Sequence, residues 1–269
     1  LALSVYLTID YLALRQAGET AEMLYTASTM WYAPLNICYS VGVDGISVVM
    51  LLLSSIIVFT GTFASWQLKP MTKEYFLWFT LLSAGVYGFF ISTDLFTMFM
   101  FYEVALIPMY LLIGVWGSGQ KEYAAMKLTL MLMGGSAFLL IGILGIFYGA
   151  GAETMNILEI AQRHIPTEMQ ELFFPLIFLG FGVLGALFPF HTWSPDGHAS
   201  APTAVSMLHA GVLMKLGGYG CFRVAMYLMP EGAEIWGNFF LVLTTISVVY
   251  GAFSAVVQTD LKYINAYSS

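Results

Sequence analysis

Long apolar runs alternate with polar connectors along almost the whole chain. A helix needs about 20 apolar residues to cross a bilayer, and seven stretches are of about this length: 46–66, 75–93, 95–116, 128–150, 172–190, 201–222 and 235–259. Residues 1–9 are also apolar but too few to cross. The pattern predicts an all-α polytopic membrane protein with seven transmembrane helices and part of another. Because the chain starts without Met and stops abruptly, we expect a fragment cut at both ends.

The composition favours the same class. Hydrophobic residues make up 59% of the chain and charged residues 9%, whereas about a quarter of the residues in a soluble domain are charged. The Lys and Arg residues form no basic stripe, which disfavours nucleic-acid binding. Cys38 and Cys221 are isolated, so this chain alone is not expected to hold an iron–sulfur cluster or structural zinc.

The charges in the connectors predict an orientation. Following the seven predicted helices places Lys69, Lys73, Lys121 and Lys262 on one side of the membrane, and Arg15, Arg163 and Arg223 on the other together with most of the acids. Cytoplasmic loops carry the excess of Lys and Arg, and acids contribute little to this rule. The sequence therefore predicts that the lysine side is cytoplasmic.

Glu103 is the only charged residue in the apolar run 95–116. A carboxylate at the centre of a membrane helix costs roughly 2.5 to 3.5 kcal/mol, so such residues usually have a function. Pro108 lacks an N–H group and leaves the carbonyl of Val104 without its helical partner beside this acid. We therefore expect a polar pocket around Glu103. Asp94, just before the run, is expected to cap the helix.

Lys215 is the only charged residue in the run 201–222, and His209 precedes it in the same predicted helix. A desolvated lysine can exchange a proton in the physiological range, which arginine cannot do. The alternatives are that Lys215 reaches the interface and that His209 is a hydrogen-bonded core residue. Their spacing turns the two side chains about 120° apart, so they suit successive proton transfers. We expect Glu103 and Lys215 to face the interior of the bundle.

Lys127 comes just before the run 128–150. A lysine at a helix end either reaches the interface or faces inward, in this case toward Glu103. The sequence leaves both open.

The segment 180–185 reads Gly-Phe-Gly-Val-Leu-Gly and matches a dinucleotide-binding pattern. It lies inside an apolar run, with no preceding strand and no acid for a ribose. We interpret these glycines, with Gly145 and Gly149, as helix-packing positions.

Three prolines, Pro189, Pro195 and Pro202, bracket a polar stretch with His191, Asp196 and His198. The prolines predict a helix that breaks within 186–200, and irregular backbone at membrane depth is tolerated only inside protein or beside a water cavity. A metal site of His191, Asp196 and His198 is disfavoured, because a fourth ligand and helical spacing are missing.

Several long motifs resemble the antiporter-like subunits of respiratory complex I, and within that group the chain M type, which corresponds to mitochondrial subunit 4. They are Val-Asp-Gly-Ile-Ser at 43–47, Phe-Tyr-Glu-Val-Ala-Leu-Ile-Pro-Met-Tyr at 101–110, Pro-Phe-His-Thr-Trp-Ser-Pro-Asp-Gly-His at 189–198, Ala-Pro-Thr-Ala at 201–204, Leu-Met-Lys-Leu-Gly-Gly-Tyr-Gly at 213–220 and Gln-Thr-Asp-Leu-Lys at 258–262. The resemblance runs essentially end to end.

The resemblance implies a subunit of fourteen helices with two inverted five-helix repeats, each containing a broken helix. Residues 1–74 would form an N-terminal stub, an extramembrane loop and the first full span. Residues 75–229 would form the first repeat, and 230–269 the start of the second.

By resemblance, Glu103 matches the intramembrane glutamate of the family and Lys215 its central lysine. The family's other lysine lies seven residues before the His191 position, where this chain has Leu184. Either another cation, Lys127 or Lys215, compensates Glu103, or this half-channel is silent. We favour a modified path that still works through Glu103, His209 and Lys215.

The resemblance thus implies a proton-translocating membrane subunit of NADH:quinone oxidoreductase in a bacterial plasma (inner) membrane rather than a mitochondrial one. NADH, FMN, iron–sulfur clusters and quinone would be bound by partner subunits, with no cofactor in this chain. The alternatives are a subunit of a multisubunit Na⁺/H⁺ antiporter or of a membrane-bound hydrogenase-type complex, and a structural scaffold, which would leave Glu103 and Lys215 unexplained.

Overall fold

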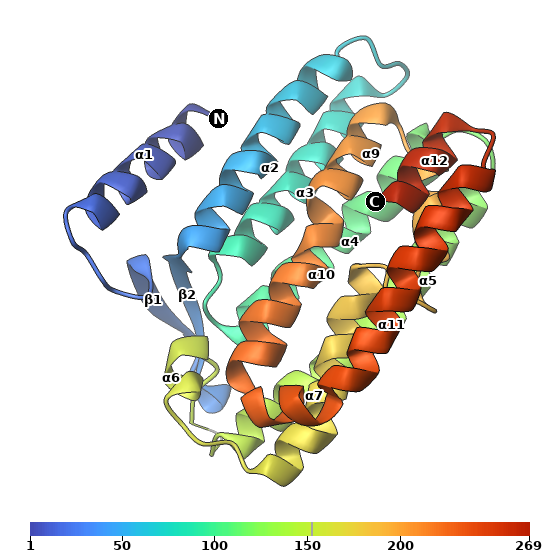
Figure 1. Ribbon diagram of the computed structural model, residues 1–269. Coiled ribbons are helices and arrows are strands. Elements are labelled where there is room, and N and C mark those ends of the chain that lie inside the picture. Colours follow the sequence, from blue (N-terminus) through green and yellow to red (C-terminus); the bar gives the residue numbers. More distant parts are fainter. Residues whose placement is uncertain (152) are drawn as a thin grey trace.

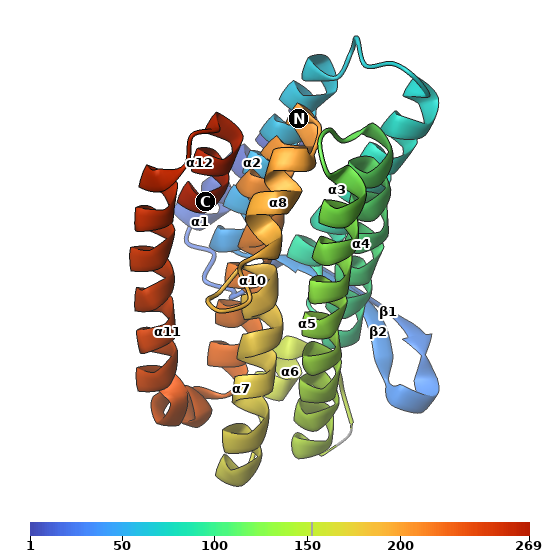
Figure 2. The ribbon, with the colours of Figure 1, turned by 90° about the vertical axis from the view of Figure 1, so that its right-hand side faces the viewer.

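Within the residues that the structure describes, six helices are long and apolar enough to cross a membrane by length and composition. They are α2 (Gly45–Ala64), α3 (Thr72–Ile91), α4 (Leu95–Trp116), α5 (Lys121–Gly149), α7 (Thr167–Leu184) and α11 (Pro230–Val257). In this computed structural model, which describes residues 1–151 and 153–269, they run alongside one another in a bundle (Figures 1 and 2). Helices satisfy every backbone group internally, as a lipid environment requires. The predicted helical membrane fold is confirmed.

The predicted span 201–222 is a composite helix that continues beyond the predicted end. It consists of α9 (Thr203–Leu208), a π-helical turn η2 (His209–Leu213), α10 (Met214–Gly220) and a second π-helical turn η3 (Cys221–Met226). The first π-helical turn begins at His209. Such turns inside helices are frequent at functional sites, so this irregularity directs attention to the same histidine as the sequence did.

The predicted break lies between α7 and a short helix, α8 (Trp193–Ser200). The span predicted to end at 190 ends instead at Leu184, and irregular backbone fills 185–192. The break was expected within 186–200 and takes up the first part of that range. Residues 193–200 are helical, because Pro195 lies in the first turn of α8, where a missing N–H is tolerated. The N–H of Phe188 donates to Ser247 Oγ at 2.6 Å, so a backbone group freed by the break finds a partner inside the protein.

Ala186, at the start of the break, has a φ of 57°. The left-handed conformation costs a residue with a Cβ roughly 1–2 kcal/mol of conformational free energy and costs glycine almost none. We therefore expect Ala186→Gly to raise the free energy of unfolding by up to about 1 kcal/mol, once the greater flexibility of glycine in the unfolded chain is subtracted. The unfolding midpoint of the purified protein should rise accordingly. Ala137→Gly, in the regular part of α5, should lower the midpoint. Equal shifts of the same sign would contradict this account.

The extramembrane loop that the resemblance implied before the first full span contains regular secondary structure. Helix α1 (Ala2–Gln16) is followed by an antiparallel hairpin of β1 (Leu24–Tyr32) and β2 (Ile37–Val43), with a 3₁₀ turn, η1 (Ala33–Leu35), between them. The hairpin packs at the α3–α4 junction, where Thr93 N–H donates to Ser40 O at 3.0 Å. The fold is helical except for this hairpin in the described residues.

Asp94 caps α4 as predicted and also holds the hairpin. Its Oδ1 accepts the N–H of Thr97 at 3.0 Å, and its Oδ2 accepts the N–H of Cys38 at 3.2 Å. One buried carboxyl group therefore fixes β2 against the start of the helix that carries Glu103.

The predicted grouping of the lysines agrees with contacts at one end of the bundle. Trp116 Nε1 donates to Pro70 O at 2.9 Å, Ser118 N to Ser200 O at 2.8 Å, and Lys262 Nζ to Ala199 O at 3.2 Å. We call this the lysine end; it includes α12 (Leu261–Ser268), at the top of Figure 1. The opposite end, called the hairpin end, holds the hairpin and the short helix α6 (Ile157–Ala161).

The glycines of 180–185 pack helices, as the sequence analysis interpreted them. A Cβ on Gly180 would lie 2.9 Å from Gly135 O and 3.0 Å from Leu139 Cβ. Helices α5 and α7 therefore approach each other closely enough that only glycine fits, which fixes α7 just before its break.

Candidate functional site

Glu103 lies on α4, at the middle of the helix. Its Oε1 is buried and has no hydrogen-bond partner among the described residues. A buried carboxyl oxygen without a partner costs free energy and in native proteins calls for an explanation, such as a catalytic role or an ordered water. At the position of the predicted polar pocket, one carboxyl oxygen of Glu103 therefore lacks a hydrogen-bond partner, and no described Lys, Arg or His forms an ion pair with this residue.

Two buried histidines and a tryptophan form a stack of rings beside the break. His209 lies parallel to Trp193, with ring centroids 5.1 Å apart, and parallel to His198, with centroids 4.2 Å apart. His198 Nδ1 is 3.1 Å from Ser206 Oγ. His198 Nε2 and His209 Nδ1 are buried without partners in the part of the chain that the structure describes. We call these three rings the histidine column.

Leu184 faces the column rather than lipid. It is 2% exposed and lines a cavity of about 10 Å³ together with Tyr102, Leu106, Trp193 and His209. A cavity of this volume is at the lower limit for a single water molecule, and its lining is mostly apolar. The position at which the resemblance implies a lysine therefore shares a cavity with His209 and with Tyr102, the neighbour of Glu103 in α4.

Lys215 lies on α10, on the wall of a different and larger cavity. This cavity of about 480 Å³ is open and lies between α7, α10 and α11. Lys215 Nζ donates to Ala210 O at 2.6 Å. We expected the bundle to enclose this lysine; its side chain is instead exposed, because α11 leaves the cavity open on this side.

Lys127 takes a third arrangement that neither sequence alternative foresaw. It faces Asp196 of α8, with Nζ 2.7 Å from Oδ2, and also lies over the ring of Tyr123. Its partner is thus not Glu103. The sequence assigned Asp196 only to the break, because the two residues are 69 positions apart and only the folded chain brings α5 and α8 together.

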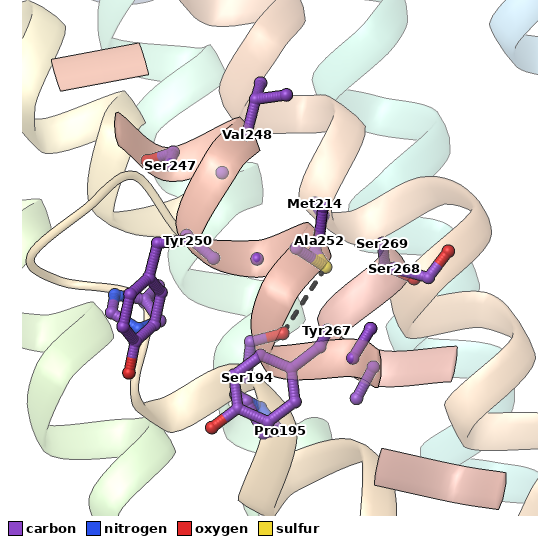
Figure 3. Close-up of a pocket in the computed structure, with 16 residues that line it drawn as sticks. Ser194, Pro195, Met214, Ser247, Val248, Tyr250, Ala252, Tyr267, Ser268 and Ser269 are labelled. Atoms are coloured by element: carbon purple, nitrogen blue, oxygen red, sulfur yellow. Dashed lines mark hydrogen bonds between the residues drawn. The ribbon is translucent and has the colours of Figure 1, made fainter. Parts of the chain in front are cut away.

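His191 and Pro189 lie in the irregular backbone of the break. The His191 ring contacts Phe188 and Tyr250, with the Tyr250 centroid at 4.9 Å. It lines an open cavity of about 430 Å³ bounded by α8, α11 and α12, where Ser194 Oγ donates to Met214 Sδ at 3.6 Å (Figure 3). In the described chain His191, Asp196 and His198 do not come together as a metal-binding group.

The structure therefore groups the predicted residues in four places. His209 and His198 form the column, Lys127 pairs with Asp196, and Lys215 and His191 lie on two separate cavities. The sequence did not single out Trp193, which stacks on His209, Tyr263, which donates to Asp196, or Tyr102, which lines a cavity with His209. Aromatic residues are so frequent in this chain, at 16%, that no spacing singled them out.

Comparison with known proteins identifies the class. Residues 92–269, more than half of the chain, match the family model described as NADH:quinone oxidoreductase/Mrp antiporter, transmembrane. The chain belongs to this family, as the resemblance predicted.

Individual relatives are more specific. The chain is 37% identical over 252 residues to NAD(P)H-quinone oxidoreductase chain 4 3 of a Picosynechococcus species, covering 93% of this chain and 46% of that protein. It is 34% identical to NADH-quinone oxidoreductase subunit M of Rickettsia prowazekii, covering 99% and 53%. It thus spans about half the length of these relatives.

A solved structure shows the same fold. The chain superimposes on a chain of respiratory complex I from Thermus thermophilus with a TM-score of 0.88 and 25% identity, covering 99% of this chain and 55% of that one. The likeness covers the helix break, the composite helix and the hairpin end together, because nearly the whole chain is aligned.

Proposed function

We propose that this chain is a proton-translocating membrane subunit of an NADH:quinone oxidoreductase of the complex I type. The observation that carries the proposal is the buried carboxyl oxygen of Glu103, which has no hydrogen-bond partner in the described residues. Its neighbour in α4, Tyr102, lines a cavity together with His209. Groups that hold and release protons inside a membrane are rare unless they conduct. Similarity to quinone oxidoreductase subunits supports the coupling to quinone reduction elsewhere in the complex.

In this proposal the proton path runs through Glu103, His209 and Lys215, with Lys127 nearer the lysine end. The half-channel works although Leu184 cannot hold a proton. His209 lines the same small cavity as Leu184 and offers a ring nitrogen without a partner in the described chain. The ring nitrogens of an imidazole can both accept and release a proton, so His209 can serve where the lysine is missing.

The organisation of the complete complex also belongs to the proposal. Residues 75–229 would form the first five-helix repeat and 230–269 the start of the second. Other antiporter-like and quinone-module subunits would be the partners in a bacterial plasma membrane, with the lysine end in the cytoplasm. In this proposal those partners bind NADH, FMN, iron–sulfur clusters and quinone.

The test is Glu103→Gln in the complete complex, in inside-out vesicles. The amide keeps the size of the side chain but cannot release a proton, so we expect the number of protons moved per electron to fall while quinone reduction is retained or slowed. Oxygen or quinone consumption and a pH-sensitive dye measure the two rates together. Glu122→Gln, at the exposed start of α5, is the matched control and should have no effect.

An unchanged ratio in the Glu103→Gln variant would remove Glu103 from the path. The main alternative is a subunit of a Na⁺/H⁺ antiporter, which the family description includes. In that case proton movement would depend on a sodium gradient and persist without NADH oxidation, so adding Na⁺ to the same vesicles separates the two functions.

A further inference from the structure

The lysine end has a cavity with a charged wall that the path described above does not use. This cavity of about 440 Å³ is open to the outside and is formed by the α4–α5 connector, the start of α5, α8 and the start of α12. Asp196, Asp260, Lys262, Tyr123 and Tyr263 line it. Water fills a cavity of this size and polarity.

Asp196 is the residue that connects this cavity to the bundle. One carboxylate oxygen accepts from Lys127 Nζ at 2.7 Å, and the other accepts from the Tyr263 hydroxyl group at 3.4 Å. The side chains of Asp196 and Lys127 are 26% and 24% exposed. The pair is therefore within reach of water and yet held by donors from two different helices.

The helix that carries Asp196 also carries His198. Asp196 faces the cavity, and His198, two positions along and therefore on the other side of α8, stacks on His209. Lys262 Nζ donates to the carbonyl groups of Ala199 and Ala201, both at 3.2 Å, at the end of the same helix. Helix α8 thus separates a water-accessible carboxylate from the buried histidine column by its own width.

We propose that Asp196 is the proton-uptake residue at a water-filled mouth on the lysine end. A proton from water in the cavity binds to the Asp196 carboxylate and neutralises it. Lys127 then loses its counter-charge and passes its own proton to a group inside the bundle, which leaves its amine neutral. Transfer of the proton from Asp196 to Lys127 restores the charged pair, so that one proton has moved from the water in the cavity into the bundle. This inference rests on the proposed function and adds a proton entrance to the proposed path.

A purely structural ion pair is the competing explanation. Partly exposed pairs contribute little to stability. If the pair were only structural, the rate of proton uptake would not depend on water access to Asp196 or on a carboxyl group at this position. The experiment therefore measures water access and pH dependence, which a structural role does not change.

The first measurement is the reaction of Asp196→Cys with a membrane-impermeant maleimide, in the complete complex and with Cys38 and Cys221 replaced by alanine. We expect labelling only from the lysine end, at a rate within about ten-fold of Ser118→Cys, because thiol reactivity follows exposure. Ser118 lies on the exposed rim of the cavity. Ser83→Cys, at a 4% exposed position, should not react. Failure of Asp196→Cys to react from the lysine end would overturn the water-filled mouth.

The second measurement compares the pH profile of proton uptake in Asp196→Asn, Asp196→Glu and Asp260→Asn. We expect Asp196→Asn to slow uptake roughly 100-fold at low proton concentration, the lower range for the loss of a positioned proton-transfer group. Asp196→Glu should restore uptake, because it again offers a carboxylate. Asp260→Asn keeps the N-cap of α12 and should behave as the unchanged protein.

A normal profile in Asp196→Asn would overturn the inference. Glu103→Gln, measured in the same vesicles, distinguishes this result from failure of the proposed function. If Glu103→Gln lowers uptake while Asp196→Asn does not, the chain conducts protons through another entrance. If neither variant changes uptake, the proposed function fails as well.

Discussion

Replacing Lys215 by alanine in the complete complex is expected to abolish most proton pumping, while quinone reduction weakens or becomes uncoupled. A relay needs a group that holds and releases a proton at the operating pH. Of the two lysines that the resemblance assigns to the path, one position is occupied by Leu184, and Lys215 is the other. Proteoliposomes with a pH-sensitive dye, combined with the rate of NADH oxidation, give the proton-to-electron ratio that checks it.

The control variants separate charge from proton exchange. Lys215→Arg keeps a positive charge that cannot be released, so we expect it to lose pumping almost as completely as Lys215→Ala. Lys73→Ala removes an exposed lysine in the first turn of α3 and should leave the ratio unchanged. If the Lys215→Ala variant keeps the normal ratio, this half-channel is silent, and the complete protein works through the part outside this chain.

The transmembrane helices were predictable because each requirement is local. A helix that crosses a lipid bilayer needs a long apolar segment, and such segments can be recognised from composition alone at 46–66 and 95–116. Helix ends were less accurate: α5 begins at Lys121 rather than 128, because polar residues at the interface continue a helix without changing the hydrophobic pattern. Asp94 was recognised as a cap because its partner, Thr97, lies within the same turn.

The remaining features depend on residues far apart in the sequence. Strand β1 has only its first residue buried, so it lacks the alternation that identifies a strand, and the hairpin was missed. The histidine column needs α8 and the π-helical turn at His209 to meet, and no sequence spacing fixes that meeting. The family lysine was noticed as absent at Leu184, but its surroundings became known only from the fold.

Those surroundings lead to a second large effect: Leu184→Lys should be tolerated only while Glu103 is present. The site at Leu184 is closed and apolar, and a lysine there has no water to solvate it. Tyr102, the neighbour of Glu103 in α4, lines the same cavity, and we expect the Glu103 carboxylate to pair with the new ammonium group. We therefore expect Leu184→Lys to assemble into a stable complex, and Leu184→Lys with Glu103→Gln to lose about 3 kcal/mol or more, the usual cost of a buried charge without its partner.

The unfolding midpoint and the amount of assembled complex measure this difference. Leu184→Met conserves volume and adds no charge, so it shows how much of any loss comes from packing alone, and Glu103→Gln alone shows the effect of the missing acid. The coupling between the two positions is the stability of the double variant minus the two separate effects. A coupling near zero would mean that Glu103 does not reach the Leu184 site, and the small cavity would then be a packing defect rather than the remains of an acid–base pair.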